Sequence, residues 1–168
     1  MTIKCTNDYA GMKKILFVCL GNICRSPGAE AVMKAFVSER GMENEFFIDS
    51  AGIYGGHSGA LPDERMRKHA QKRGYTLDSR ARQFYASADF AEFDMIIGMD
   101  NQNIADLKRM AITGEELGKI YRMTDFCRKN TTYKEVPDPY YGGDEGFELV
   151  LDLLEDAVSG IFQFCSAR

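Results

Sequence analysis

Short apolar runs alternate with helical patterns along this chain. Four of the runs are of strand length and cover residues 14–18, 46–52, 93–99 and 119–123. The first, KILFV, is apolar at all but one position, which is typical of a strand buried on both faces of a parallel sheet. We therefore expect these runs to form four strands.

Helical patterns separate and follow the runs. Pro27 suits the first turn of a helix that Gly41 would end, and Gly74 would close a second helix over residues 62–73. Residues 101–111 predict a third helix. The last helix is the most regular, because its apolar residues recur at spacings of three and four: Phe147, Val150, Leu151, Leu154, Val158, Ile161 and Phe162.

The alternation of strands and helices predicts the fold class. Such chains form a parallel sheet with helices packed on its faces. We expect a single α/β domain with a central parallel four-stranded sheet flanked by helices, flavodoxin-like or Rossmann-like in arrangement. A chain of 168 residues is long enough to bury a core in one domain. Residues 1–11 are polar and without pattern, so we expect an N-terminal extension there and a domain over residues 12–168.

Composition and charge argue against several classes of partner. A net charge of −4 gives no reason to expect nucleic acid or an anionic membrane surface. The five cysteines are irregularly spaced and never form a CxxC pair, and there are only two histidines, so neither a disulfide framework nor a zinc site is expected. Because we find no signal peptide and no apolar run of membrane-spanning length, we expect a cytoplasmic protein.

The segment VCLGNICRSP joins the first predicted strand to the first predicted helix. It therefore lies at the carboxyl end of a parallel strand, where open α/β sheets bind ligands. Backbone N–H groups of such a loop and of the following helix start form a concave site for an anion, here a phosphate loop. It is not a nucleotide-binding Walker loop, because GxxxxGK[ST] is absent. Gly21 lets the backbone approach the anion, and Asn22 tolerates the left-handed conformation that such a loop needs.

Cys19 and Arg25 give this anion site a reactive group. Beside Arg25 and among N–H groups, Cys19 is expected to be a thiolate near neutral pH, with the Ser26 hydroxyl hydrogen-bonded to its sulfur. The planar guanidinium of Arg25 can bind two oxygens of a phosphate. The loop thus predicts attack by Cys19 on a bound phosphate and a phosphocysteine intermediate. The plainer alternative is an ordinary buried cysteine, since C-x5-R alone is a weak pattern.

A proton donor for the leaving group is found far along the chain, in EVPDPYYGGDEGF. Asp138 is fixed between Pro137 and Pro139, and a carboxylic acid held in this way can protonate a leaving oxygen. Tyr140 and Tyr141 follow directly and can line the mouth of the site with aromatic surface. Taken alone, the segment is better explained as a turn before the last helix.

Together these segments closely resemble the low-molecular-weight protein tyrosine phosphatases. The likeness is carried by VCLGNICRSP (18–27), DSAG (49–52), FDMIIGMD (93–100) and DPYYG (138–142), and it extends from about Lys13 to the C-terminus. The resemblance implies hydrolysis of protein phosphotyrosine without metal or cofactor, with Cys19 as the nucleophile, Arg25 as the phosphate clamp and Asp138 as the acid. Tyrosine-phosphorylated proteins would be the partners, a cognate tyrosine kinase is a further candidate, and phosphate and other oxyanions would act as inhibitors.

The resemblance also implies roles around these three residues. The substrate-binding residues would be Leu20, Gly21, Asn22, Ile23, Cys24, Ser26, Tyr54, Tyr140 and Tyr141. The side chains of Asn22, Ser26 and Ser50 would hold the loop in shape, and Asp100 would orient Arg25. Cys24 corresponds to the family's second loop cysteine, which can form a reversible disulfide with the nucleophile. It is also explained as a small buried apolar residue.

Two positions depart from the family pattern. Gly56 stands where relatives usually carry a bulky aromatic wall, so either the substrate slot is open on that side or Tyr54 turns in to close it. Ser79 stands where many relatives have a histidine, and we expect the supporting hydrogen bond there to differ. His57 and His69 are assigned no function, because a cysteine phosphatase of this type needs no histidine base.

Three rival functions are weighed against this one. Arsenate reductase on the same fold uses further cysteines in a segment after the middle of the sheet, and residues 79–99 contain none. Phosphoarginine phosphatases of this fold tend to carry threonine where this chain has Ile23, and they lack the tyrosine pair. A binding module without turnover has no support in the sequence, since Cys19, Arg25 and Asp138 are all present.

Overall fold

The apolar run over residues 14–18 forms an inner strand of the sheet. The computed structural model describes residues 11–167, so the predicted extension lies almost entirely outside the described residues. In this part of the chain β1 (Lys13–Cys19) pairs with β2 (Phe46–Gly52) and with β3 (Met95–Gly98), and β4 (Ile120–Arg122) pairs with β3. All pairs are parallel and the order is β2-β1-β3-β4, which confirms the predicted four-stranded α/β fold.

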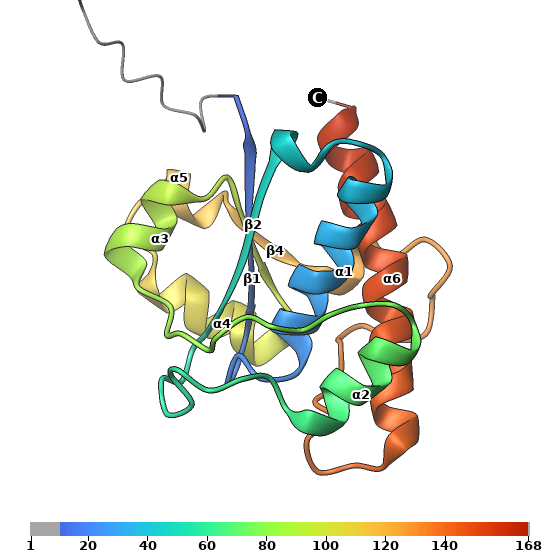
Figure 1. The fold of residues 1–168 in the computed structure, drawn as a ribbon. Helices are drawn as coiled ribbons and strands as arrows, with labels where there is room; N and C mark the ends of the chain where they lie inside the picture. Colours follow the sequence, from blue (N-terminus) through green and yellow to red (C-terminus); the bar gives the residue numbers. More distant parts are fainter. Residues whose placement is uncertain (1–10, 168) are drawn as a thin grey trace, which may run out of the picture.

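Helices cover both faces of the sheet (Figure 1). On one face lie α1 (Arg25–Glu39), α2 (Glu64–Lys72) and α6 (Asp144–Ser166). On the other lie α3 (Ala86–Glu92), α4 (Asn101–Met110) and α5 (Gly114–Leu117). Two short 3-10 helices, η1 (Glu43–Glu45) and η2 (Met123–Phe126), precede β2 and follow β4.

The alternating side chains of β1 contribute to two separate cores. Ile15, Phe17 and Cys19 belong to the core under α1 and α6, whereas Leu16 and Val18 belong to the core on the opposite face. Burial on both faces explains why the run is apolar without interruption. It also points the last side chain of the strand, Cys19, toward the start of α1.

Some element bounds differ from those predicted. The helix predicted over 62–73 begins at Glu64, because the Asp63 carboxylate accepts hydrogen bonds from the N–H groups of Arg65 and Met66 and so caps it. The strand predicted over 93–99 is limited to Met95–Gly98. The short helices α3 and α5 were not predicted, since seven and four residues show too little apolar periodicity.

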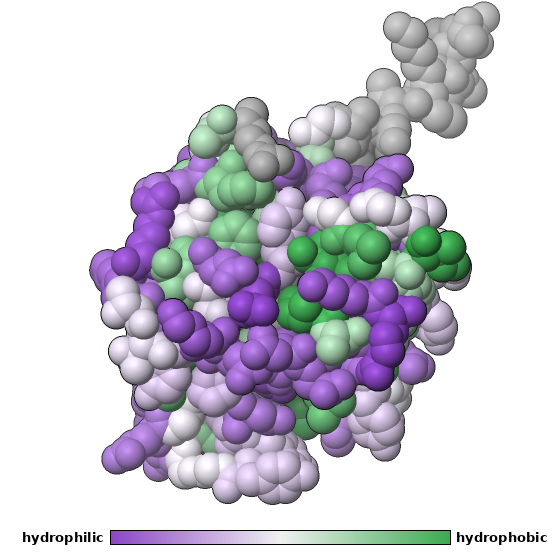
Figure 2. All heavy atoms as spheres, turned by 180° about the vertical axis from the view of Figure 1, so that it is seen from behind, coloured by the Kyte–Doolittle hydropathy of each residue, from purple (hydrophilic) through white to green (hydrophobic). Residues whose placement is uncertain are grey.

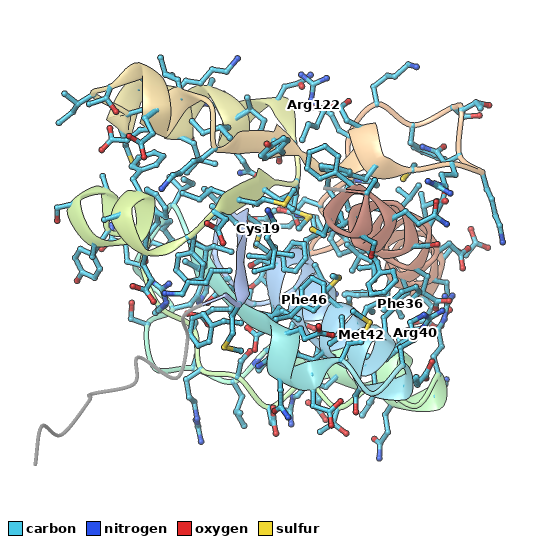
Figure 3. All side chains as sticks on the ribbon, turned by 90° about the horizontal axis from the view of Figure 1, so that it is seen from above. Cys19, Phe36, Arg40, Met42, Phe46 and Arg122 are labelled. Atoms are coloured by element: carbon cyan, nitrogen blue, oxygen red, sulfur yellow. The ribbon has the colours of Figure 1, made fainter. Side chains whose placement is uncertain are left out.

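An aromatic cluster joins α1, β2 and α6 at the end of the sheet opposite Cys19. Figure 3 shows Phe36, Arg40, Met42 and Phe46 gathered beside α6. The Phe162 ring centroid lies 5.2 Å from that of Phe36 and 6.0 Å from that of Phe46. The Arg40 guanidinium lies 3.5 Å from the Phe36 centroid, within cation–π range. This end of the molecule is therefore closed by packing, and the opposite end carries the pocket.

The surface is largely polar. Figure 2 shows apolar side chains in a few small areas of one face among polar ones. Exposed apolar residues include Ile112 and Leu117, near α5. None of the described helices is long and apolar enough to cross a membrane.

Candidate active site

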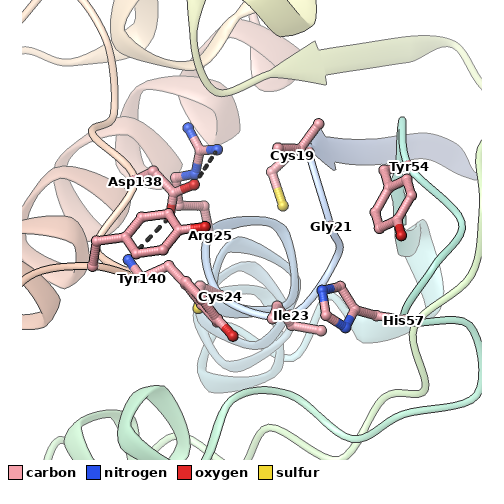
Figure 4. Close-up of a pocket in the computed structure, with 11 residues that line it drawn as sticks. Cys19, Gly21, Ile23, Cys24, Arg25, Tyr54, His57, Asp138 and Tyr140 are labelled. Carbon is pink, nitrogen blue, oxygen red and sulfur yellow. Dashed lines mark hydrogen bonds and ion pairs between the residues drawn. The ribbon is translucent and has the colours of Figure 1, made fainter.

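A pocket of about 240 Å³ opens where β1 ends and α1 begins. Figure 4 shows the Cys19 sulfur between two groups of side chains, with Asp138 and Tyr140 on one side and Tyr54 and His57 on the other. The pocket is lined by Cys19, Leu20, Gly21, Ile23, Cys24, Arg25, Tyr54, His57, Asp138, Tyr140 and Tyr141. Residues from three distant parts of the sequence thus meet at the carboxyl edge of the sheet, the expected binding place in this fold class.

The backbone of the phosphate loop adopts the conformation expected from its residues. Asn22 has φ 57°, in the left-handed region that asparagine tolerates better than most residues. A Cβ at Gly52, the last residue of β2, would lie 2.9 Å from the carbonyl oxygen of Leu20 and 3.0 Å from the N atom of Asn22. Glycine at position 52 therefore allows β2 to approach the loop closely.

The Ser26 hydroxyl is placed to donate a hydrogen bond to the Cys19 sulfur. Ser26 Oγ lies 3.0 Å from Cys19 Sγ and 3.4 Å from the carbonyl oxygen of Ala51. Asn22 Nδ2 donates to Ser26 Oγ (2.8 Å), so the serine oxygen acts as an acceptor there and its own proton is free for another group. The shorter distance favours the sulfur, and a hydrogen bond to sulfur stabilises a thiolate.

Behind the loop, Asn22 is held by three groups. Its Nδ2 also donates to Ser50 Oγ (2.9 Å), and its Oδ1 accepts from the backbone N–H of Arg82 (3.0 Å). Ser50 in turn donates to the buried carboxylate of Glu30 (2.6 Å). In the segment that contains Ser79, the group that hydrogen-bonds to Asn22 is thus the backbone N–H of Arg82 and not a side chain at position 79. Sequence reasoning missed Glu30 and Arg82, because neither lies in a motif.

Arg25 is fixed at the bottom of the pocket. Its Nη1 donates to Asp100 Oδ2 (2.7 Å) and to the carbonyl oxygen of Val136 (3.1 Å), and its Nη2 lies 3.6 Å from Asp138 Oδ2. Asp100 also caps α4 through the N–H of Asn103 (2.7 Å), so the carboxylate that holds Arg25 is itself anchored. Within residues 11–167 no protein group accepts a hydrogen bond from Nε, which leaves that donor for a ligand.

Arg25 remains a cation despite its burial. Its side chain is 3% exposed. Burial alone would lower the pKa of Arg25, but the negative charges of Cys19 and Asp100 outweigh it and raise the pKa above its ordinary value. The pocket therefore holds a permanent positive charge next to the cysteine.

Asp138 lies at the mouth of the pocket. One carboxylate oxygen, Oδ1, accepts the backbone N–H of Tyr140 (3.0 Å), and the other faces Arg25. The side chain is 41% exposed, so a ligand or a water molecule can reach it. A carboxyl group within reach of solvent and of the bound ligand is placed for proton transfer.

Aromatic side chains flank the mouth. The rings of Tyr140 and Tyr141 meet edge to face with centroids 4.9 Å apart, and Tyr141 is 93% exposed. On the other side, the rings of Tyr54 and His57 are perpendicular, with centroids 6.1 Å apart. His57, for which the sequence predicts no function, thus lies on the pocket wall.

Cys24 lies beside the nucleophile position but is shielded. It is 4% exposed. Burial, followed by the negative charges of Asp63 and Cys19, raises the pKa of Cys24 well above its ordinary value. Cys24 is therefore a neutral thiol at neutral pH.

Two of the residues predicted to bind substrate do not line the pocket. Asn22 and Ser26 are 2% and 0% exposed, and their side chains lie behind the loop. Their side-chain hydrogen bonds, like those of Ser50 and Asp100, are directed to protein groups.

An anion-binding loop containing a cysteine and an arginine, with an aspartate at its mouth, is the arrangement expected of a phosphatase. The family model described as "Low molecular weight phosphotyrosine protein phosphatase" matches residues 14–167. A low molecular weight protein-tyrosine-phosphatase of Streptomyces coelicolor is 39% identical over 149 residues, which are 88% of this chain and 90% of that protein. The chain belongs to this family of protein tyrosine phosphatases, as predicted, and it is an enzyme of that class.

Solved structures agree in fold. A protein tyrosine phosphatase from Entamoeba histolytica superposes with a TM-score of 0.88 at 46% identity, covering 92% of this chain and 97% of that one. A Drosophila arginine phosphatase superposes with a TM-score of 0.81 at 32% identity, covering 90% and 96%.

Proposed function

We propose that this protein hydrolyses phosphotyrosine in proteins through a phosphocysteine intermediate and without a metal ion. The observation that carries the proposal is the meeting of Cys19, Arg25 and Asp138 in one pocket with aromatic walls. Arg25 supplies the positive charge that a metal ion would supply in a metal-dependent phosphatase. The N–H groups of the loop and of the start of α1 add to it.

In the first step, the phosphate binds to the loop and to the free N–H groups of Arg25. The Cys19 thiolate attacks phosphorus, so that a P–S bond forms while the bond from phosphorus to the phenolic oxygen breaks. Asp138, protonated at this stage, gives its proton to the leaving phenolate. The Ser26 hydroxyl stabilises the thiolate before attack through its 3.0 Å contact.

In the second step, water replaces the phenol. The Asp138 carboxylate takes a proton from a water molecule, which attacks phosphorus and breaks the P–S bond. Inorganic phosphate leaves and Cys19 is again a thiolate. One residue therefore serves first as acid and then as base, as its access to both the ligand and solvent allows.

The aromatic walls favour an aryl phosphate. Tyr140 and Tyr54 stand on opposite sides of the pocket, with the sulfur between them, so that a phenyl ring bound to the phosphate would lie between two rings (Figure 4). Tyrosine-phosphorylated proteins are therefore the proposed partners, and free phosphate and related oxyanions the proposed inhibitors. The cytoplasmic location and the cognate kinase stay predictions of the sequence.

Phosphoarginine is the second candidate substrate, because an arginine phosphatase shares the fold at 32% identity. Against it stand Ile23 and the tyrosine pair, all of which line the pocket. Arsenate reduction has less support, since Cys127 and Cys165 do not line it.

The test is phosphate release from matched peptides carrying phosphotyrosine, phosphoserine or phosphoarginine, with a chelator and fresh thiol present. We expect turnover of the phosphotyrosine peptide alone. Turnover of the phosphoarginine peptide would assign the second candidate, and loss of activity in chelator would contradict a metal-free reaction.

The Cys19→Ser variant checks the nucleophile. It should lose turnover by at least about a thousandfold, because an alcohol is far less ionised than a thiol, yet it should still bind phosphate. Substantial activity in Cys19→Ser would contradict the phosphocysteine intermediate.

A further inference from the structure

The segment that carries Asp138 is attached to the rest of the protein by few contacts. Val136, just before it, is bound to Met99 and Arg25, and α6 begins just after it, at Asp144. Between them, only one group from another element within residues 11–167 hydrogen-bonds to the backbone of residues 137–142. It is Nη2 of Arg65, which donates to the carbonyl oxygen of Tyr140 at 2.9 Å.

Arg65 is itself held in place. Its Nε and Nη2 each lie 3.2 Å from a different oxygen of the Asp63 carboxylate, a two-point contact that fixes the plane of the guanidinium. Its Cζ lies 5.5 Å from the ring centroid of Tyr140 and 4.9 Å from that of Phe147, in the first turns of α6. The guanidinium is therefore placed by α2 and by two rings.

The same chain of contacts reaches the phosphate loop. The backbone N–H of Asp63 donates to the carbonyl oxygen of Ile23 at 2.8 Å. Ile23 lies in the loop between Cys19 and Arg25. The loop that binds phosphate is thus connected through Asp63 and Arg65 to the segment that carries the proposed acid.

The last contact reaches the acid itself. The N–H of Tyr140 donates to Asp138 Oδ1 at 3.0 Å, while the carbonyl oxygen of Tyr140 is bound by Arg65. Holding Tyr140 in place therefore also holds the group that orients the Asp138 carboxyl. Proton transfer depends steeply on such placement.

We propose that Arg65 is a positioning residue for Asp138, which it places by binding the Tyr140 carbonyl. This rests on the proposed role of Asp138 as general acid. The simpler account is that Arg65 only packs α2 against α6. The two accounts differ in what a substitution does to different leaving groups, because the acid matters for a basic phenolate and hardly at all for a very acidic phenol.

The test compares Arg65→Met with Arg67→Met. Arg67 is a matched control, since it lies in the same helix and its Nε also donates to a backbone carbonyl, that of Pro62 (3.1 Å), away from the acid segment. Arg65→Met should lower kcat/KM, which reports the step that releases the phenol, by about ten- to a hundredfold on phenyl phosphate and by less than about threefold on 2,4-dinitrophenyl phosphate. Arg67→Met should match wild type on both. Equal losses of Arg65→Met on the two substrates would overturn the proposal.

Arg65→Lys is a second variant in case Arg65→Met folds poorly. A lysine cannot bind Asp63 at two points and Tyr140 at once, so the same leaving-group dependence should appear. In an Asp138→Asn background, neither substitution at Arg65 should reduce activity on phenyl phosphate further. An additional loss there would mean that Arg65 acts elsewhere.

Hydrogen exchange provides a readout that needs no activity. In Arg65→Met, the amides of residues 138 and 140–143 should exchange faster than in wild type or in Arg67→Met. If wild type hydrolyses none of the peptides, the proposed function fails, and exchange still tests the Arg65 contact. If exchange is unchanged in Arg65→Met, the contact does not hold the segment and the proposal fails on its own.

Discussion

The phenol ring of Tyr54 occupies the space that a side chain at position 56 would need. A Cβ built on Gly56 would overlap the Cζ and Oη atoms of Tyr54. The aromatic wall that the family resemblance leads us to expect at position 56 is thus absent, and a ring from two residues earlier lines the pocket in its place. Of the two alternatives left open by the sequence, the structure has the second, in which Tyr54 turns in.

Gly56→Ala should therefore act on the substrate slot through Tyr54. The added methyl group displaces the ring, and the loss of one stacking surface costs about 1 kcal/mol, or about fivefold in KM for phenyl phosphate. Tyr54→Ala should have a similar effect, and the double variant should be no worse than either single one. Steady-state kinetics measure this.

Tyr85→Ala is the control for these variants, because Tyr85 is an exposed tyrosine that does not line the pocket. If Tyr54→Ala binds phenyl phosphate as well as Tyr85→Ala does, the Tyr54 ring is not a wall of the slot.

Asp138→Ala should reveal the leaving-group proton. We expect a loss of about a hundredfold or more in kcat/KM on phenyl phosphate and a much smaller loss on 2,4-dinitrophenyl phosphate, whose phenolate leaves without a proton. Asp144→Ala is the comparison, since Asp144 follows the same segment but does not line the pocket. A uniform loss across both substrates would contradict the role of Asp138 as acid.

Cys24 is expected to protect an oxidised Cys19. Peroxide converts the Cys19 thiolate to a sulfenic acid, which condenses with the Cys24 thiol to a disulfide and releases water. Oxidation also removes the negative charge on Cys19, which is one of the causes that raise the pKa of Cys24. Once Cys19 is oxidised, the pKa of the Cys24 thiol is therefore raised less strongly, which favours the thiolate that forms the disulfide.

The measurement is recovery of activity by thiol after a peroxide pulse. Cys24→Ser should recover less than wild type, because its sulfenic acid is oxidised further to forms that thiol does not reduce. Cys127→Ser is the matched control, since Cys127 is a half-buried cysteine away from the pocket. Equal recovery of the two variants would leave Cys24 as a packing residue.

Asp63 should stabilise the fold in a pH-dependent way. Partial burial would raise its pKa, but hydrogen bonds from Arg65 and from two backbone N–H groups outweigh this and lower the pKa of Asp63 below its usual 3.8. A lowered folded-state pKa means that the stabilisation is fully present above about 3.8 and is lost as the pH falls through the folded value.

Asp63→Ala should accordingly lower the free energy of unfolding by about 1 kcal/mol at pH 7, as expected for a lost helix N-cap. The difference from wild type should shrink at pH 3. Urea unfolding at the two pH values measures it, with Glu64→Ala as the exposed control. A difference that stays constant with pH would mean that the charge of Asp63 contributes nothing.

The sequence predicted those features that depend on neighbours in the chain. The parallel sheet, the left-handed Asn22 and the loop from Cys19 to Arg25 follow from local pattern and residue type. Asp138 was singled out from the residues as a candidate acid, but it was the family motifs that favoured its meeting with this loop over a simple turn, because no periodicity relates residues more than a hundred positions apart.

Residues that act through long-range contacts were missed. Arg65 binds Tyr140 across 75 positions, and Arg82 binds Asn22 across 60. In the sequence Arg65 is an arginine among other charged residues, which usually indicates a solvated surface. The Arg82 contact is made by its backbone N–H, which no residue type reveals. His57 was dismissed for its chemistry, whereas its place on the pocket wall follows from the path of the loop after β2.

The unequal anchoring of the two halves of the pocket has a thermodynamic consequence. The phosphate loop is built into the junction of β1 and α1 and is hydrogen-bonded from behind by β2. Within residues 11–167, the backbone of residues 137–142 receives a hydrogen bond from another element only through Arg65, and the Asp138 side chain adds a 3.6 Å contact with Arg25. Local unfolding should therefore release the acid segment at a lower free-energy cost than the loop. In mild denaturant a population should exist that still binds phosphate but has lost turnover. Inactivation should therefore occur at a lower denaturant concentration than global unfolding. Phosphate should stabilise the protein against global unfolding more than against inactivation.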